Sequence, residues 1–195
     1  MNEVAQALRA FTRIAVPLDG RRAAAVAVAI SDSDDGPAFW LTRRASRLRG
    51  HAGQFALPGG RLDRGEDAMA AALRELHEEI GATAGREQCL GLLDDYPTRS
   101  GYVITPVVVK LSDGQRMTPN PAEVAELYRI PFSELDVPPM FRTIPESDRP
   151  VIQIPLAGHL VHAPTAAVLY QFREVALHNR ETRVAHLEQP VFAWR

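Results

Sequence analysis

Residues 59–82 read GGRLDRGEDAMAAALRELHEEIGA, and this stretch decides how the 195-residue chain folds. Between residues 67 and 80, apolar side chains recur at spacings of three and four, which predicts an amphipathic helix with one face on a sheet. These side chains are Met69, Ala72, Leu73, Leu76 and Ile80. Asp63 or Gly65 is expected to cap the start of the helix, and Gly81 stands where a left-handed C-terminal cap is expected.

Three carboxylates, Glu75, Glu78 and Glu79, fall within about a third of the circumference of this helix, beside the apolar stripe. We therefore expect them to share one exposed face. Like charges at these spacings cost a helix a few tenths of a kcal/mol per pair, and Arg74 offsets only part of that cost. A hard divalent cation would compensate, because Mg²⁺ takes oxygen ligands from carboxylates, waters and phosphates. A solvated charged face is the alternative.

The order of fixed residues in this stretch resembles the signature of the Nudix hydrolase family. Gly60, then Glu66, then the run REL-x-EE-x-G over residues 74–81 match that signature at every fixed position. The last position, usually a larger aliphatic residue, is Ala82. The resemblance implies an α/β fold in the broad α+β sense, in which helices sandwich a mixed β-sheet and a loop-helix-loop holds the metal.

The resemblance also implies roles for the residues of this stretch. Glu75 and Glu79 are expected to bind the metal, Mg²⁺ or Mn²⁺, with Glu78 and the carbonyl of Gly60 as further ligands. Arg74 is expected to orient a helix glutamate, and Glu66 to brace the loop against the helix. Water would then attack a phosphoanhydride, and either Glu75 or Glu123 would act as its base, depending on which lies within reach. Family members often supply such a carboxylate from a later segment, where Glu126 is a second candidate.

Residues 41–60, LTRRASRLRGHAGQFALPGG, are locally basic and lead into the glycine turn. Planar guanidinium groups suit phosphate oxygens, which indicates an anionic substrate. The string is similar to the segment of the coenzyme A pyrophosphatase subgroup of Nudix hydrolases, apart from Ala45 and Leu57. The resemblance implies cleavage of coenzyme A or acyl-CoA to 3′,5′-ADP and 4′-phosphopantetheine or its acyl form. The expected substrate-binding residues are Arg44, Arg49, His51 and Gln54.

Two other functions stay open at this point. Pro97 lies fifteen residues past Ala82, close to where ADP-ribose pyrophosphatases of the family carry a proline, so ADP-ribose or another nucleoside diphosphate derivative is the alternative substrate. A catalytically silent nucleotide-binding module is the alternative of a different class. His159 and His162 are candidate phosphate contacts, although isolated histidines are usually structural or solvated.

Composition predicts one soluble domain over residues 1–195, with an N-terminal helical extension at 1–20 and further strand and helix elements at 150–195. A net charge of −2 argues against nucleic acid and membranes as partners. The one cysteine, Cys89, and the lack of a long apolar run indicate a cytoplasmic protein. The partner is therefore expected to be a small molecule, and the chain a monomer or homodimer.

Local patterns predict the remaining elements. A short helix is expected at 3–11, a hairpin at 23–30 and 38–42, a loop over the site at 45–58, and strands at 88–93 and 103–111. Residues 120–135 predict a turn, a strand and a helical turn. Residues 137–148 predict a Pro-rich loop, followed by a strand pair and a helix after Pro164. The apolar end, LEQPVFAWR, is expected to dock on the domain or on a second subunit.

Overall fold

The computed structural model describes residues 1–46 and 53–194. Within them the main sheet has the strand order β3-β2-β1-β7-β5, and β4, β6 and β8 pair with β1, β7 and β2. The pair β1·β7 is parallel and the other pairs of this sheet are antiparallel, so the sheet is mixed. The strands are β1 (Arg22–Ser31), β2 (Ala38–Arg44), β3 (Phe55–Ala56), β4 (Gly59–Arg61), β5 (Cys89–Leu92), β6 (Tyr96–Pro97), β7 (Tyr102–Lys110) and β8 (Val124–Pro131).

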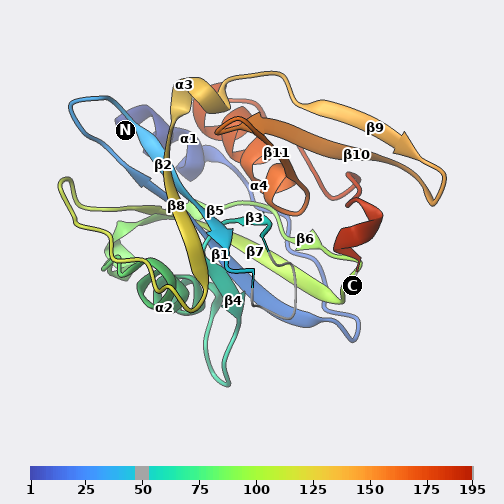
Figure 1. Cartoon of the computed structure of the whole chain (residues 1–195), viewed down its shortest axis with the longest axis horizontal. Coiled ribbons are helices and arrows are strands. Elements are labelled where there is room, and N and C mark those ends of the chain that lie inside the picture. Colours follow the sequence, from blue (N-terminus) through green and yellow to red (C-terminus); the bar gives the residue numbers. More distant parts are fainter. Residues whose placement is uncertain (47–52, 195) are drawn as a thin grey trace.

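Alternate residues of β1 face two different cores, because successive side chains of a strand point to opposite faces. Ala25, Ala27 and Ala29 pack against α2 (Ala68–Ile80), and their small size suits a helix lying close to the sheet. Val28 and Ile30 belong to the other core, which includes residues of α1 (Asn2–Ala10) and α4 (Thr165–Phe172). Helices therefore cover both faces of the sheet (Figure 1).

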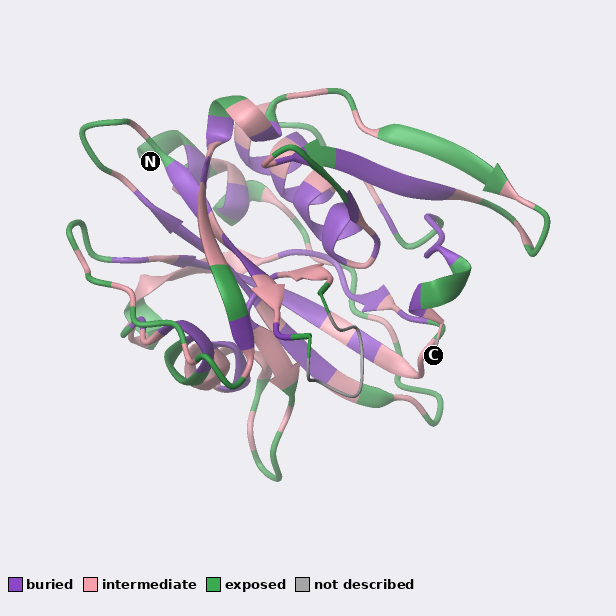
Figure 2. Ribbon diagram, viewed as in Figure 1, coloured by how far each residue is buried: buried purple, intermediate pink, exposed green. Residues whose placement is uncertain are grey.

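A second, three-stranded sheet has the order β11-β10-β9 and packs against α4. Its strands are β9 (Met140–Ile144), β10 (Ser147–Leu156) and β11 (His159–His162), and α3 (Phe132–Leu135) precedes it. A π-helical turn (Arg173–Leu177) continues α4, and 3-10 turns lie at Arg86–Gln88 and Val191–Ala193. Figure 2 shows the buried residues gathered in the central strands and α4, with β9 exposed.

The structure confirms the predicted helices, the first hairpin, the strands around 88–93 and 103–111, and the strand and helical turn within 120–135. The prediction of a loop at 137–148 was wrong, because β9 and the start of β10 pair there. Most of β9 is exposed, so its sequence lacks the apolar alternation that would have predicted a strand. The two-residue β3 likewise lies within the predicted loop at 45–58 and pairs with β2.

The caps of α2 explain where this helix begins and ends. Neither Asp63 nor Gly65 is its N-cap: the Asp67 side chain accepts a hydrogen bond from the Ala70 backbone N–H at 2.9 Å. Asp67 is also paired with Arg86, so one carboxylate serves both the cap and a salt bridge. Gly81 ends the helix at φ 69°, as predicted.

The C-terminal segment folds back on the same chain. The Tyr96 hydroxyl donates to the Leu187 carbonyl at 2.9 Å, and Arg99 forms a salt bridge with the buried Glu188 at 2.6 Å. Trp194 donates its indole N–H to the Gln189 carbonyl at 2.9 Å. Across the described residues, every helix is too short or too polar to span a bilayer.

Candidate functional site

The turn from Gly59 to Gly60 brings the backbone of β4 against two neighbours. A Cβ atom at Gly59 would overlap the backbone of β1 at Ala25 and Val26, and one at Gly60 would overlap the Glu75 carboxylate. The lack of side chains thus lets β4 pair with β1 while Glu75 of α2 lies directly against the Gly60 backbone. Both glycines are required by close approach rather than by an unusual backbone conformation.

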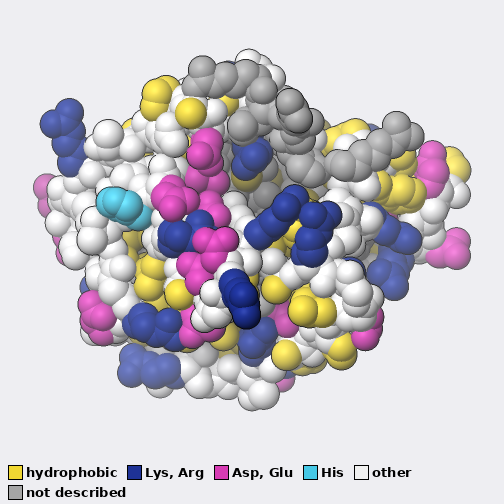
Figure 3. Space-filling model, turned by 90° about the horizontal axis from the view of Figure 1, so that it is seen from below, with side chains coloured by type: hydrophobic (Ala, Val, Ile, Leu, Met, Phe, Trp, Pro, Cys, Tyr) yellow, Lys and Arg dark blue, Asp and Glu magenta, His cyan; other side chains and the backbone are white. Residues whose placement is uncertain are grey.

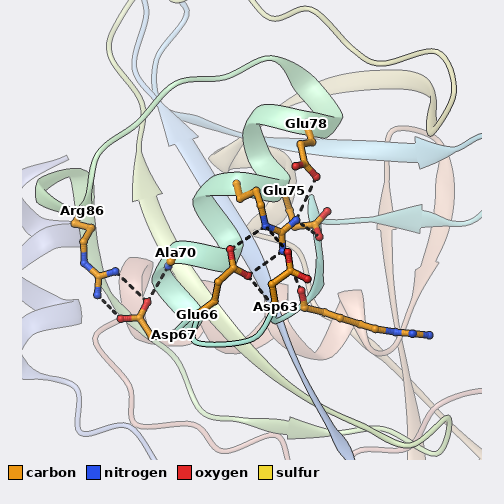
Figure 4. Close-up of polar contacts among 9 residues, drawn as sticks. Asp63, Glu66, Asp67, Ala70, Glu75, Glu78 and Arg86 are labelled. Atoms are coloured by element: carbon orange, nitrogen blue, oxygen red, sulfur yellow. Dashed lines mark hydrogen bonds and ion pairs between the residues drawn. The ribbon is translucent and has the colours of Figure 1, made fainter.

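Arg74 ties the loop before α2 to the carboxylates of the helix (Figure 4). Its Nε and Nη2 donate to the two oxygens of Glu66 at 2.9 and 3.1 Å, and Nη2 also donates to the Arg61 carbonyl at 3.0 Å. Its Nη1 donates to Glu75 at 2.8 Å and to Glu78 at 3.2 Å. These bonds lower the pKa of Glu66 and raise that of Arg74. The guanidinium therefore offsets the repulsion between neighbouring carboxylates.

The three helix glutamates do not share one exposed face, which corrects the sequence prediction. Glu79 is 3% exposed, the Glu75 side chain is 14% exposed and that of Glu78 is 52% exposed. The difference arises because β4 packs along α2 on the side of Glu75 and Glu79. Glu78 points to the outside, where Arg74 alone holds it among the described side chains.

Burial, and to a smaller extent the nearby negative charges of Glu75 and Glu123, raise the pKa of Glu79 to about 8. Arg44 and the Gly59 backbone N–H act in the opposite direction. Burial is also the main cause that raises the pKa of Glu75. A carboxylate that burial and like charges both disfavour is a candidate functional group.

Glu123 comes from a separate segment that backbone hydrogen bonds fasten to the end of α2. The Asn120 N–H donates to the Glu79 carbonyl at 2.8 Å, and the Ala45 N–H donates to the Glu123 carbonyl at 2.8 Å. Glu123 is half-buried and lies near enough to raise the pKa of both Glu75 and Glu79. Glu126 lies elsewhere: it is exposed and paired with Arg43.

The donor set of this cluster suits a hard divalent cation. Carboxylate oxygens of Glu75, Glu78, Glu79 and Glu123 and the Gly60 carbonyl are the ligand type that Mg²⁺ takes, usually from one or two carboxylates with the shell completed by water and phosphate. A cation would favour the ionised form of the buried Glu79, because burial and the neighbouring carboxylates disfavour its charge. The described side chains form no group of three or more His, Cys, Asp or Glu converging on one point. Water and phosphate would complete the shell of an ion at these carboxylates, as they usually do for Mg²⁺.

A cavity of about 580 Å³ adjoins this cluster on the sheet face that carries α4. Its floor comes from β1, β4 and β7, and its wall from β11, the start of α4 and the C-terminal segment. The polar side chains that line it are Arg44, Gln54, Arg61, Thr98, Ser100, Tyr102, His159, His162, Thr165 and Gln189. Figure 3 shows acidic side chains beside a group of basic ones on the neighbouring surface.

The predicted substrate-binding residues are only partly visible in this arrangement. Arg44 and Gln54 line the cavity, and the buried Nε of Arg44 has no hydrogen-bond partner within the described chain. Arg49 and His51 lie outside the described residues. Both candidate histidines, His159 and His162, line the cavity at its other end, and burial lowers the pKa of His162.

Other cavity residues were not among the predicted site residues. Arg61, Tyr102 and Phe192 line the cavity, although they lie on β4, β7 and the last turn of the chain. The alternation of β7 places Tyr102 on the same face of the sheet as Ile104, which also lines the cavity. Phe192 reaches the cavity because the C-terminal segment folds back, and its ring lies 5.1 Å from the His162 ring centroid.

Comparison with known proteins identifies the family. The model of the NUDIX domain matches residues 20–153, which are more than half of the chain. The chain belongs to the Nudix family. The Nudix match runs from β1 into β10 and includes α2 and the Gly59–Gly60 turn. It confirms the predicted α+β fold with a mixed sheet between helices.

Individual relatives of this Nudix chain agree with that assignment. It is 43% identical over 99 residues to an uncharacterized Nudix hydrolase NudL of Photorhabdus laumondii, and 41% identical over 119 residues to that of Pectobacterium atrosepticum. The matches cover 50% and 60% of this chain and 53% and 62% of those relatives, so the similarity spans about half of each curated protein. The crystal structure of the M. smegmatis Nudix hydrolase RenU is 23% identical, with a TM-score of 0.55 over 82% of this chain and 88% of that one. This likeness supports the fold.

Proposed function

We propose that the chain is a divalent-metal-dependent pyrophosphohydrolase that cleaves the phosphoanhydride of coenzyme A or acyl-CoA. The observation that carries this proposal is the buried Glu79, gathered with Glu75 and Glu123 at the Gly59–Gly60 turn. An arginine-bearing cavity of about 580 Å³ adjoins it, and ligand pockets of this size hold molecules as large as a nucleotide derivative. The resemblance of residues 41–60 to the coenzyme A subgroup selects the substrate.

The metal ligands that we propose are Glu75, Glu79, Glu78 and the Gly60 carbonyl, with Mg²⁺ or Mn²⁺ as the ion. When bound, a divalent cation would neutralise phosphate charge and lower the pKa of a water. Within the chain, Arg74 holds Glu75 and Glu78 in place, and Glu66 holds Arg74 against the loop. The Nε–H of Arg44 has no acceptor among the described residues, and we propose that it donates to a phosphate oxygen.

Either Glu75 or Glu123 would accept the proton of the attacking water. Glu75 is fastened to Arg74, which favours its ionised form, whereas the Glu123 carboxylate contacts only the Asn120 amide, at 3.5 Å, among the described residues. The less constrained Glu123 is therefore free to move towards a water, and we propose it as the first candidate for the base.

Replacing Glu79 with glutamine tests the proposal, because the amide preserves size and removes the charge. We expect turnover of coenzyme A to fall by two orders of magnitude or more at saturating Mg²⁺, while the folded structure persists. Glu126→Gln is the matched control, since Glu126 is exposed and paired with Arg43 away from the cluster. Retained turnover in the Glu79 variant would contradict the proposed metal site.

Product identification by mass spectrometry distinguishes the possible substrates. Coenzyme A, acyl-CoA and ADP-ribose are incubated with the protein and with Mg²⁺, Mn²⁺ or a chelator. Metal-dependent release of 3′,5′-ADP from coenzyme A or acyl-CoA is the expected result. Products from ADP-ribose alone would select the alternative substrate, and binding of all three without products would indicate a silent nucleotide-binding module.

ADP-ribose is the second candidate because of the loop that contains Pro97. Thr98 and Ser100, which follow Pro97, line the cavity, so this loop contributes to the substrate wall. In the same wall, Ala163 and Pro164 precede the Thr165-Ala166 pair where the coenzyme A subgroup usually carries an aromatic residue and a glycine. These two features are the specific reasons to compare both substrates.

We further propose that residues 1–195 form a single domain. One hydrophobic core joins Val4 and Leu8 of α1 with Ile152 of β10 and Phe172 of α4, so the helical extension at 1–20 and the elements at 150–195 are packed together. Arg183 reinforces this packing, because it donates to the Thr12 carbonyl at 3.0 Å and to Asp94 at 2.9 Å. Unfolding in a single cooperative transition is the expected result.

A further inference from the structure

Two arginine side chains lie against one aromatic ring at the edge of the cavity. The Cζ of Arg22 lies 4.8 Å and that of Arg61 lies 5.4 Å from the centroid of the Tyr102 ring. The Nε–H of Arg61 also donates to the Tyr102 hydroxyl at 2.9 Å. Tyr102 and Arg61 line the cavity, and Arg22, which does not line it, lies against the Tyr102 ring.

Strand register explains why the three side chains meet. Arg22 of β1 is the parallel partner of Tyr102 on β7, and Ala24, two residues further along β1, is the antiparallel partner of Arg61 on β4. Paired residues and residues two apart lie on the same face of a sheet. The two arginines and the tyrosine are therefore placed together by three strands rather than by mobile loops.

Among the described residues, no acidic side chain neutralises the charges of the two arginines. Arg43, Arg74 and Arg86 all form salt bridges, but neither Arg22 nor Arg61 does so with any described residue. Two guanidinium groups on one ring repel each other unless an anion joins them. Their terminal N–H groups point to no protein acceptor in the described part of the chain, so they are available for a ligand.

The chemistry of this group favours a phosphate. Guanidinium groups pair with phosphate oxygens through parallel hydrogen bonds, and two of them match a doubly charged monoester better than a singly charged diester. A nucleobase is a poorer ligand, because the arginines already occupy the ring of Tyr102. Arg61 follows Gly60 directly, so a phosphate here would lie beside the reacting centre without occupying it.

We propose that Arg22 and Arg61, held on Tyr102, form a subsite for a phosphomonoester on the nucleoside half of the substrate. This proposal rests on the proposed function, because it names which part of the substrate the cavity distinguishes. The subsite selects nucleotide derivatives that carry a phosphate on the ribose over those that do not. In coenzyme A that group is the 3′-phosphate of the adenosine.

Binding of the product halves tests the subsite without catalysis. Calorimetry without metal measures the affinities for 3′,5′-ADP, its isomer 5′-ADP and AMP. The two isomers differ only in the position of the second phosphate, so their comparison separates the effect of that position from the effect of total charge. We expect 3′,5′-ADP to bind about tenfold more tightly than the other two, as a charge-assisted hydrogen-bonded pair would give. Arg22→Gln should remove this preference and Arg22→Lys should restore part of it.

Arg21→Gln is the matched control, since Arg21 is the neighbouring arginine but bonds to Asp19 and to the carbonyls of Pro17 and Leu18. It should leave all three affinities unchanged. Equal affinity of the wild type for 3′,5′-ADP and 5′-ADP, or the same loss for all three ligands in Arg22→Gln, would overturn the subsite.

Turnover assays distinguish a failure of the proposed subsite from a failure of the proposed pyrophosphohydrolase activity. Arg22→Gln should lower kcat/KM about tenfold for coenzyme A and leave it unchanged for the analogue that lacks the 3′-phosphate. Equal rates for both substrates in the wild type would overturn the subsite while the pyrophosphohydrolase stands. If the wild type cleaves neither, the proposed function fails, and the calorimetry still decides whether the subsite exists.

Discussion

The acidic cluster of α2 and the cavity differ in how the chain builds them. The cluster comes almost entirely from residues 59–79, with the side chains bonded to Arg74 a few positions apart on one helix and its preceding loop. The cavity collects residues from β1, β4, β7, β11, α4 and the C-terminal segment. Short-range spacing can specify a metal-binding face, whereas a substrate wall depends on which strands and helices become neighbours.

The meeting point of these two regions is Gly60, which lies in the cavity wall and against Glu75. A substitution at Gly60 therefore affects both regions at once. Replacing Gly60 with alanine would drive a methyl group into the Glu75 carboxylate. We expect turnover to fall by about a hundredfold or more, since displacement of a reacting group by about 1 Å has that effect.

Gly85→Ala is the control for Gly60→Ala, because its Cβ would also meet a carboxylate, that of Glu87. Glu87 is exposed and moves aside freely, so activity and stability should both stay near those of the wild type. Turnover assays and thermal unfolding of both variants are the measurements. Full activity in Gly60→Ala would show that the close approach of β4 to α2 is not needed.

The second prediction concerns stability of the metal-free protein as a function of pH. The pKa of Glu79 is about 8 in the folded protein and near 4.5 in the unfolded chain, so between these values the folded state binds more protons. Stability should therefore fall as pH rises from about 5 to 8, by up to about 1.4 kcal/mol per pH unit. Urea unfolding at several pH values measures this slope.

Glu79→Gln should flatten that slope, because glutamine does not titrate. The variant should be more stable than the wild type at pH 8 in the absence of metal, while Mg²⁺ should stabilise the wild type more than the variant. An equal slope in the two proteins would show that Glu79 does not carry the raised pKa.

The smallest effect that we expect is a change in KM when a side chain of the cavity wall is truncated. Phe192 is 53% exposed and packs edge-on against His162, so its truncation removes one contact of the wall. Phe192→Ala should raise KM about threefold and leave kcat nearly unchanged, as loss of an aromatic contact of about 0.6 kcal/mol implies. Val191→Ala is the control, because Val191 is exposed but does not line the cavity. A fall in kcat alone would contradict a role limited to substrate contact.

Sequence alone was sufficient to predict α2, because helical period, the Gly81 cap and the order of Glu66, Arg74 and the glutamates are local properties. Hairpin β1–β2 and strands β5 and β7 followed from the same kind of local pattern. β9 did not, because it is held by pairing with β10 and its own residues are mostly exposed.

Only the tertiary structure decided the rest. Helical spacing groups Glu75, Glu78 and Glu79, but packing of β4 along α2 makes Glu79 buried and leaves Glu78 half-exposed. Register between β1, β4 and β7 brings Arg22, Arg61 and Tyr102 together from distant positions. The physical reason is that burial and strand pairing are properties of neighbours in space, and a local pattern cannot specify which distant segments become neighbours.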